Sequence, residues 1–263
     1  MISVIIPVYN AEKSIEKSLA SIKDQTWNGD FEIIIVNDGS TDGSRTIIEN
    51  YRLKNPEMNI QLLNQQNRGV SCARNTAMKI AKGEFLALLD ADDEWLPEKT
   101  EKQMRLLSDE DNKIDFLTSL WNDEKVRFPY SVDPKSKLVP VTLRKLLFKI
   151  TGQTSTAIFK RRVLENTGYF DENQSYSEDA NYWMRITENN KMSLLPEKLV
   201  FAGGGKKSFG SSGLSANLPE MEKGIQKNIR EMYRAGRINL AEYVFYFVIS
   251  KMKYWVRPLR AKL

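Results

Sequence analysis

Four short apolar segments in the first 90 residues alternate with segments that have helical spacing. The apolar segments, each the length of a buried strand, are residues 2–9, 31–36, 60–63 and 84–89. The first intervening segment is predicted to be a helix from Ala11 to Gln25, because apolar residues recur at Ile15, Leu19 and Ile22 with the spacing of one helix face. Strands that alternate with helices in this way predict an α/β fold with a mostly parallel sheet flanked by helices.

The rest of the chain is less regular. We expect strands at residues 116–121 and 156–159 and helices at residues 141–150 and 178–188. Residues 202–217 are rich in glycine and serine and predict a flexible loop. Beyond this loop the sequence is helical in character to its end. We therefore divide the chain into a core domain, 1–218, and a helical C-terminal extension, 219–263.

The chain has no histidine and one cysteine, which limits its chemistry. Without histidine, catalysis must use carboxylates, hydroxyls or lysines. The single Cys72 excludes an intramolecular disulfide and a multi-cysteine zinc site, and it is compatible with a reducing cytoplasm. Met1 to Ile6 lacks the basic region of a signal peptide, and no apolar stretch approaches the roughly 18 residues of a membrane-spanning helix. We expect a cytoplasmic protein.

The net charge of +5 belongs to the C-terminal end of the chain. Residues 220–263 contain ten lysines and arginines and four acids, so that the body before them is close to neutral. A body without excess positive charge does not predict a nucleic-acid partner. Residues 242–257 mix aromatic and aliphatic side chains with Lys251, Lys253 and Arg257. This pattern suits a helix at the surface of an anionic membrane, although packing on the body or on a second subunit, as in a homodimer, explains it equally.

Polar loops follow three of the predicted strands, at Tyr9, at Asn37–Ser40 and at Asp90–Asp93. Because ligands bind beyond the carboxyl ends of parallel strands, these loops mark a candidate site. Three acids within four residues repel one another unless a cation or substrate offsets their charge, and hard oxygen ligands favour Mg²⁺ or Mn²⁺. The alternatives are that the second loop is a simple turn with a helix cap, and that Asp92 or Asp93 caps a helix beginning near residue 97.

The chain resembles family 2 inverting glycosyltransferases, whose fold is of the GT-A type. The resemblance covers roughly residues 2–200 and rests on four ordered motifs, Val4-Ile5-Ile6-Pro7-Val8-Tyr9-Asn10, Asn37-Asp38-Gly39-Ser40-Thr41-Asp42, Asn67-Arg68-Gly69-Val70 through Ala73-Arg74-Asn75, and Gly83-Glu84-Phe85 through Asp90-Ala91-Asp92-Asp93. It implies transfer of a sugar from a nucleotide-sugar donor, with uridine as the favoured base, to an acceptor hydroxyl. The implied cofactor is Mn²⁺ or Mg²⁺.

The resemblance also implies roles for the donor-side residues. Tyr9 would pack against the nucleobase in a pocket shaped by Pro7 and Val8. Asp38 would accept a hydrogen bond from the base. Arg74 would lie near the nucleotide, the alternative being an arginine on the surface of a helix.

Two further motifs would supply the metal ligand and the base. Asp92 would bind the metal directly, with Asp90 beside the ribose or supporting the metal. Ser177-Glu178-Asp179 resembles the acidic pair at the start of the active-site helix, with Asp179 as general base. The alternative for Asp179 is a helix cap, since a helix N-terminus stabilises a carboxylate. A single displacement at the anomeric carbon would invert its configuration.

The sequence departs from the family pattern in the loop after this helix. Many members carry a histidine there, where this chain offers Lys206 or Lys207, which would bind the diphosphate or simply lie in solvent. The Gln-x-x-Arg-Trp signature and membrane helices of chain-extending synthases are missing, which favours transfer of one sugar per acceptor. The implied setting is bacterial surface-polysaccharide or lipid-linked glycan assembly, at the inner face of the cell membrane if the C-terminal helix contacts lipid.

Two other functions compete with this interpretation. A sugar-nucleotide nucleotidyltransferase needs a glycine-rich phosphate loop after the first strand, where this chain has Pro7-Val8-Tyr9-Asn10. A non-catalytic partner of an active transferase would keep the fold and could lose its acids, yet Asp38, Asp90, Asp92 and Asp179 are all present. Both alternatives therefore rank below a transferase.

Overall fold

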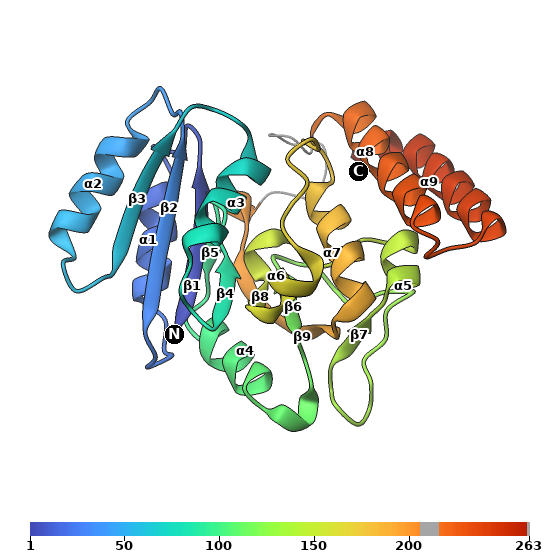
Figure 1. Cartoon of the computed structure of the whole chain (residues 1–263), viewed down its shortest axis with the longest axis horizontal. Helices are drawn as coiled ribbons and strands as arrows, with labels where there is room; N and C mark the ends of the chain where they lie inside the picture. Colours follow the sequence, from blue (N-terminus) through green and yellow to red (C-terminus); the bar gives the residue numbers. More distant parts are fainter. Residues whose placement is uncertain (206–215, 262–263) are drawn as a thin grey trace.

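The computed structural model describes residues 1–205 and 216–261 (Figure 1). Its strands are β1 (Ile2–Val8), β2 (Phe31–Asp38), β3 (Ile60–Gln65), β4 (Phe85–Leu88), β5 (Glu94–Trp95), β6 (Phe116–Trp121), β7 (Val139–Val141), β8 (Ile158–Lys160) and β9 (Met192–Phe201). Its α-helices are α1 (Ile15–Lys23), α2 (Ser44–Lys54), α3 (Val70–Ile80), α4 (Lys99–Leu107), α5 (Leu143–Phe148), α6 (Arg162–Thr167), α7 (Glu178–Asn189), α8 (Leu218–Arg234) and α9 (Leu240–Ala261). Lys206, Lys207 and most of the predicted glycine-rich loop lie outside the described residues.

The described strands form one sheet in the order β3-β2-β1-β4-β8-β6-β9-β5, with β7 paired to β9. The first four strands in this order are parallel, as the alternating pattern predicts. Beyond β4 the sheet is mixed, because β8 runs antiparallel to both β4 and β6, whereas β6 and β9 are parallel. The regular half of the sheet therefore corresponds to the regular half of the sequence.

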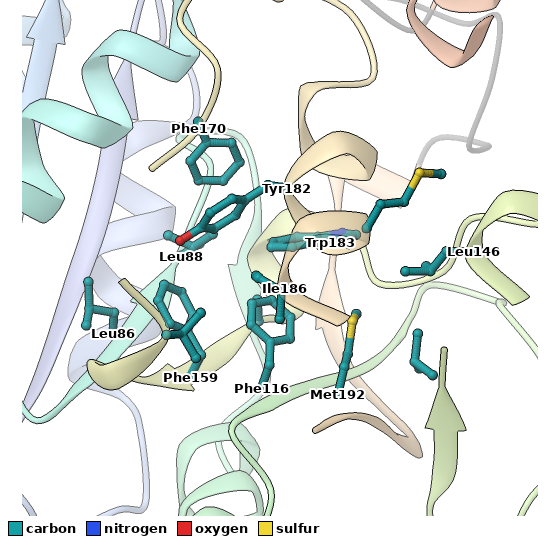
Figure 2. Close-up of a cluster of buried hydrophobic side chains, with 14 of the residues drawn as sticks. Leu86, Leu88, Phe116, Leu146, Phe159, Phe170, Tyr182, Trp183, Ile186 and Met192 are labelled. Atoms are coloured by element: carbon teal, nitrogen blue, oxygen red, sulfur yellow. The ribbon is translucent and has the colours of Figure 1, made fainter. Parts of the chain in front are cut away.

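Alternate side chains of the central strands enter two hydrophobic cores, one on each face of the sheet. In β4, Leu86 and Leu88 enter one core, and Phe85 and Ala87 enter the other. Figure 2 shows the first core, where the aromatic side chains of α7 pack among residues of the strands. The Trp183 ring lies 4.6 Å from that of Phe116, centroid to centroid. This packing anchors α7, and with it the first turn of that helix, against the sheet.

The two C-terminal helices lie side by side at one end of the molecule, at the right of Figure 1, and α1, α2 and β3 lie at the other end. Helix α8 packs against both α7 and α9, and α9 also contacts α5. Among the described residues, no helix has the length and apolar character needed to cross a membrane.

Helix α1 begins four residues later than its apolar spacing indicates, at Ile15. The preceding backbone is held by the loop after β2, since the N–H of Ala11 donates to Ser44 Oγ at 2.7 Å and that of Glu12 donates to Asp42 at 3.0 Å. These bonds hold the start of the segment in a turn. The loops after β1 and β2 are thereby fastened together at the edge of the sheet where the candidate site lies.

Candidate functional site

The structure brings the predicted donor-side residues to one edge of the sheet. Strands β2, β1 and β4 are parallel neighbours, so their carboxyl ends lie together. Pro7 and Val8 are buried at the end of β1, and Tyr9, just beyond them, is 53% exposed. Asn10 adopts a left-handed conformation, with φ of 49°, and its Oδ1 accepts from the N–H of Thr41 at 2.8 Å. The exposed Tyr9 ring is thus carried on a fixed turn.

Asp38 ends β2 and is buried, with 3% of its surface exposed. Its carboxylate accepts hydrogen bonds from Gln65 Nε2 at 2.7 Å and from the N–H groups of Arg68 and Gly69 at 3.0 and 2.8 Å. Asp38 therefore orders the connection between β3 and α3, a function that the sequence does not reveal. The turn interpretation of this motif is also partly right, because Asn37 Oδ1 accepts from the N–H of Ser40 at 3.1 Å.

The acids after β4 occupy three different environments. Asp93 is buried and accepts from Ser155 Oγ at 2.5 Å, Gln153 Nε2 at 2.6 Å and the N–H of Gly203 at 2.7 Å. Burial, together with the charges of Asp90 and Asp92, raises the pKa of Asp93 to about 7 despite these bonds. Asp92 is exposed at the same edge. The cluster therefore concentrates negative charge that a bound cation would offset.

Neither Asp92 nor Asp93 caps the next helix, so that alternative is wrong. Helix α4 begins at Lys99 with Glu98 at its N-cap, and it has no side-chain capping bond. The described residues contain no group of three or more acidic, histidine or cysteine side chains arranged to hold a metal alone. An exposed Asp92 beside Asp90 offers one or two oxygen ligands. This set fits Mg²⁺ or Mn²⁺ in a site where phosphate and water complete the coordination.

Arg74 joins the acidic cluster to the first turn of α7. Its guanidinium donates to Asp90 at 2.7 Å through Nη2 and to Glu178 at 3.0 Å through Nη1. Arg74 is 3% exposed, so the alternative of a surface arginine on α3 is wrong. Burial alone would lower its pKa, but the two carboxylates raise it above its ordinary value and hold the charge in place. Residues far apart in the sequence are thus linked in one buried ionic network.

The acidic pair opens α7 directly after Ser177, a non-glycine residue with φ of 55°. Burial and the neighbouring Asp179 raise the pKa of Glu178 to about 7, against the opposing charge of Arg74. Burial is also the largest cause that raises the pKa of Asp179, whose Oδ1 accepts from the N–H of Ala180 at 2.7 Å. A carboxylate with a raised pKa is suited to accept a proton in a reaction near neutral pH.

Sequence reasoning missed several residues that shape this site. Ser155 accepts a bond from the N–H of Asp90 at 2.9 Å and donates to Asp93, so it ties two positions of the acidic cluster together. Gln153 supports Asp93 from the same segment. Neither residue lies in a motif or follows a periodic strand, and no sequence signal marks them.

Comparison with known proteins gives consistent matches. The family model described as Glycosyl transferase family 2 matches residues 3–168. The UDP-Glc:alpha-D-GlcNAc-diphosphoundecaprenol beta-1,3-glucosyltransferase WfgD of Escherichia coli is 30% identical over 199 residues, which cover 74% of this chain and 73% of WfgD. The chain spans only 34% to 58% of the length of three other curated relatives that it matches.

Solved structures share the fold. S. aureus TarS in complex with UDP-GlcNAc superposes with a TM-score of 0.71 at 25% identity, over 94% of this chain and 70% of TarS. The mannosyltransferase PcManGT of Pyrobaculum calidifontis, in complex with GDP-Man and Mn²⁺, gives a TM-score of 0.69 at 20% identity, over 95% of this chain and 73% of that one. These neighbours confirm the expected GT-A-like architecture, a mixed α/β sheet flanked by helices.

Proposed function

Because the chain belongs to glycosyl transferase family 2, we propose that it transfers a single sugar from a UDP-sugar to an acceptor hydroxyl, with inversion at the anomeric carbon. WfgD, by its name, uses a UDP-sugar, and TarS binds UDP-GlcNAc. The observation that carries the proposal is the bridge that Arg74 makes between Asp90 and Glu178. It joins the donor-side acids and the acidic pair of α7 in one site, as a transfer between two bound substrates requires.

The donor nucleotide would bind at the carboxyl ends of β1, β2 and β4. In this proposal the exposed Tyr9 ring packs on the uracil, above the buried Pro7 and Val8. Asp38, which already accepts three hydrogen bonds, lies at the end of the adjacent strand, where it would accept one more from the base. Arg74 would act near the nucleotide through Asp90, whose carboxylate it holds.

Asp92, with Asp90 beside it, would hold Mn²⁺ or Mg²⁺ together with the donor diphosphate. A divalent ion supplies charge neutralisation for the departing diphosphate. The exposure of Asp92 supports this assignment, as do the charges of Asp90 and Asp92, which add to burial in raising the pKa of Asp93. The Mn²⁺ in the PcManGT complex is a precedent within the same fold.

Asp179 would act as the general base. Its carboxylate takes the proton of the acceptor hydroxyl, while the hydroxyl oxygen forms a bond to the anomeric carbon and the bond from that carbon to the diphosphate oxygen breaks. One in-line displacement inverts the configuration of the sugar. The raised pKa of Asp179 supports the role, since it makes the carboxylate a better proton acceptor than an exposed aspartate.

The acceptor would be a glycan or a lipid-linked glycan in bacterial surface-polysaccharide assembly, and WfgD, by its name, acts on such a lipid-linked acceptor. We place the enzyme in the cytoplasm, with α9 in peripheral contact with the inner face of the membrane. The side chains of Val244, Phe245, Val248, Met252 and Trp255 support this contact, because they lie on one face of α9 and are all about half exposed or more.

Thermal unfolding with UDP, GDP and dTDP, each with and without Mn²⁺, tests the donor site. A ligand at about 100 times its dissociation constant adds roughly 2.7 kcal/mol, enough to raise the melting temperature by a few degrees. We expect a Mn²⁺-dependent rise with UDP in the wild type. The rise should be lost in Asp92→Ala and kept in Glu49→Ala, which removes an exposed carboxylate on α2. If no nucleotide shifts the melting temperature of the wild type, a non-catalytic partner protein becomes the better interpretation.

A further inference from the structure

One face of α8 contacts the first turn of α7 and the segment that leads into it. Its contact residues, spaced three or four positions apart, are Met221, Gly224, Asn228 and Glu231. A Cβ atom added to Gly224 would lie 2.2 Å from the carbonyl oxygen of Tyr176. The α8 backbone therefore lies directly against this segment, and α7 and α8 can be followed side by side in Figure 1.

Asn228 lies at the centre of this contact and is fully buried. Its Nδ2 donates to the carbonyl oxygen of Ser177 at 2.9 Å. Its Oδ1 accepts from Gln174 Nε2 at 2.8 Å and from Asn181 Nδ2 at 3.2 Å. A buried amide with donor and acceptor both engaged fixes the geometry of its partners, because losing either bond leaves a buried polar group unpaired.

Ser177 needs such support. Its φ of 55° is a left-handed conformation that is unfavourable for a non-glycine residue, and it persists only where the surroundings impose it. The Ser177 carbonyl oxygen accepts from Asn228, from Gln174 Nε2 at 3.1 Å and from the N–H of Asn181 at 3.1 Å. Ser177 sets the direction of the chain that continues into Glu178 and Asp179. Its conformation is therefore held partly by a residue of the C-terminal extension.

We propose that Asn228 is a positioning residue for Asp179: it acts from α8 through Ser177, so that the extension is part of the catalytic unit. The proposal rests on the proposed function insofar as Asp179 is the base. Its geometric part, that α8 fixes the start of α7, stands on the contacts alone. Asn228 does not itself touch a substrate in this scheme.

Three variants of α8 test the proposal. Asn228→Ala removes all three bonds, whereas Asn228→Asp keeps the size and the acceptor Oδ1 and removes the donor to Ser177. The matched control is Gln226→Ala, since Gln226 is another buried amide of α8 but bonds Glu222, on the side where Ser250 of α9 also bonds Glu222. If α8 had a purely structural role, substitutions at Asn228 and at Gln226 would have similar effects on activity.

The first readout is release of UDP from UDP-glucose or UDP-GlcNAc with Mn²⁺, with water as the acceptor that takes the sugar. We expect both Asn228 variants to lower kcat by about 10- to 100-fold with the donor KM unchanged within about twofold, because misplacement of a catalytic group costs rate and not donor binding. Gln226→Ala should keep the wild-type kcat. Equal kcat in all variants, or an equal loss in Gln226→Ala, would overturn the proposal.

The second readout, amide hydrogen exchange of residues 174–181, does not depend on activity. Faster exchange of this segment in the Asn228 variants, and not in Gln226→Ala, supports the geometric part, and unchanged exchange overturns it. Asp179→Asn separates the two proposals: if it keeps the wild-type rate while the exchange result holds, the base assignment fails and the positioning of Glu178 and Asp179 by α8 stands.

Discussion

Asp179 lies in the first turn of α7, where burial raises the pKa of its carboxyl group. A general base acts only when it is deprotonated, so we expect the transfer rate to fall as the pH drops through this raised pKa. The loss should begin at a higher pH than an exposed aspartate would give, since the ordinary pKa is near 3.9. A profile of kcat against pH for UDP release measures this limb.

Glu178 is the necessary control for this profile, because burial raises its pKa to about 7 and its own titration would also produce an acid limb. Glu178→Gln keeps an acceptor for Arg74 and removes the titration. If the acid limb persists in Glu178→Gln and kcat falls by about 10²- to 10⁴-fold in Asp179→Asn, the base is Asp179. Disappearance of the limb in Glu178→Gln would assign the titration to Glu178 instead.

Lys99 is another buried ionisable residue, but it has no part in the proposed reaction. Its side chain is fully buried, and its Nζ has no hydrogen-bond partner among the described residues and lies 4.2 Å from the centroid of the Trp95 ring. Burial lowers the pKa of Lys99 well below its ordinary value. Between the lowered folded pKa and the unfolded one, the unfolded chain binds more protons, so this group makes the protein more stable as pH rises through that interval.

We therefore expect Lys99→Met to stabilise the protein at pH 7 by about 1–3 kcal/mol, because it removes an unpaired buried polar group and keeps an unbranched apolar stem. The difference in stability between Lys99→Met and the wild type should become smaller as the pH rises toward the ordinary pKa of lysine. Melting temperatures of the wild type and variant at several pH values measure the difference. Lys102→Met is the control, because Lys102 is an exposed residue of α4 that is paired with Glu197. This variant should change the free energy of unfolding by no more than about 0.5 kcal/mol. A loss of stability in Lys99→Met would mean that the ammonium is stabilised by the Trp95 ring.

Single-residue chemistry was only partly predictable from the sequence. The positions at the ends of β1, β2 and β4 follow from strand patterns, since a parallel sheet brings such ends together. The side chains that contact these positions cannot be predicted from the strand patterns. Arg74 and Glu178 are 104 positions apart, and their ion pair depends on how α7 docks on the sheet. The burial of Arg74 and Asp93, which decides their electrostatics, is likewise a tertiary property.

At the scale of secondary structure, the positions of these strands and helices were predictable, but the directions of the strands and the exact bounds of the helices were not. Residues 116–121 form the expected strand, and the helix expected at 178–188 is α7. The mixed direction of strands beyond β4 has no local signal, because a short apolar strand reads the same whether it runs parallel or antiparallel. Similarly, the bonds from Ala11 and Glu12 to the next loop delay the start of α1 in a way that apolar spacing cannot indicate.

The loops after β2 and β3 meet at Gly39, at the edge of the sheet where we propose that the donor binds. Its φ is 74°, and an added Cβ would lie 2.8 Å from the backbone nitrogen of Asn67. We expect Gly39→Ala to cost about 1–2 kcal/mol for the left-handed conformation, plus a further loss because the loop after β3 must move. Since that loop is ordered by Asp38, nucleotide binding should weaken as well.

Gly236→Ala is the matched control for this effect. Gly236 has φ of 70°, and no atom of the described residues lies within 4 Å of its added Cβ, so only the conformational cost applies there. The difference in free energy of unfolding between the two variants therefore measures the loop contact, and the UDP-induced thermal shift measures its consequence for binding. Equal destabilisation with an unchanged shift would show that the two loops at Gly39 move independently.

The whole molecule presents an apolar face on α9, at the end of the protein opposite α2 (Figure 1). Phe245 and Trp255 are 51% and 75% exposed. After Glu242 the sequence contains five lysines and arginines and no acid. A second copy of α9 would bring like charges together, whereas an anionic lipid surface satisfies both the apolar face and the positive charge.

The double variant Phe245→Ser/Trp255→Ser should therefore bind vesicles of anionic phospholipid at least about tenfold more weakly than the wild type, since burial of each aromatic side chain is worth about 1.5–3 kcal/mol. Co-sedimentation measures the binding, and high salt should weaken it in the wild type. Leu53→Ser, which removes a 74% exposed leucine from α2, is the control and should bind as the wild type does. If instead the double variant changes the mass of the protein in solution and leaves vesicle binding unaltered, α9 is an interface between copies of the chain. Membrane contact would also explain why the exposed face is apolar although the opposite side of α9, where Tyr246 and Ser250 are buried, already packs on the protein.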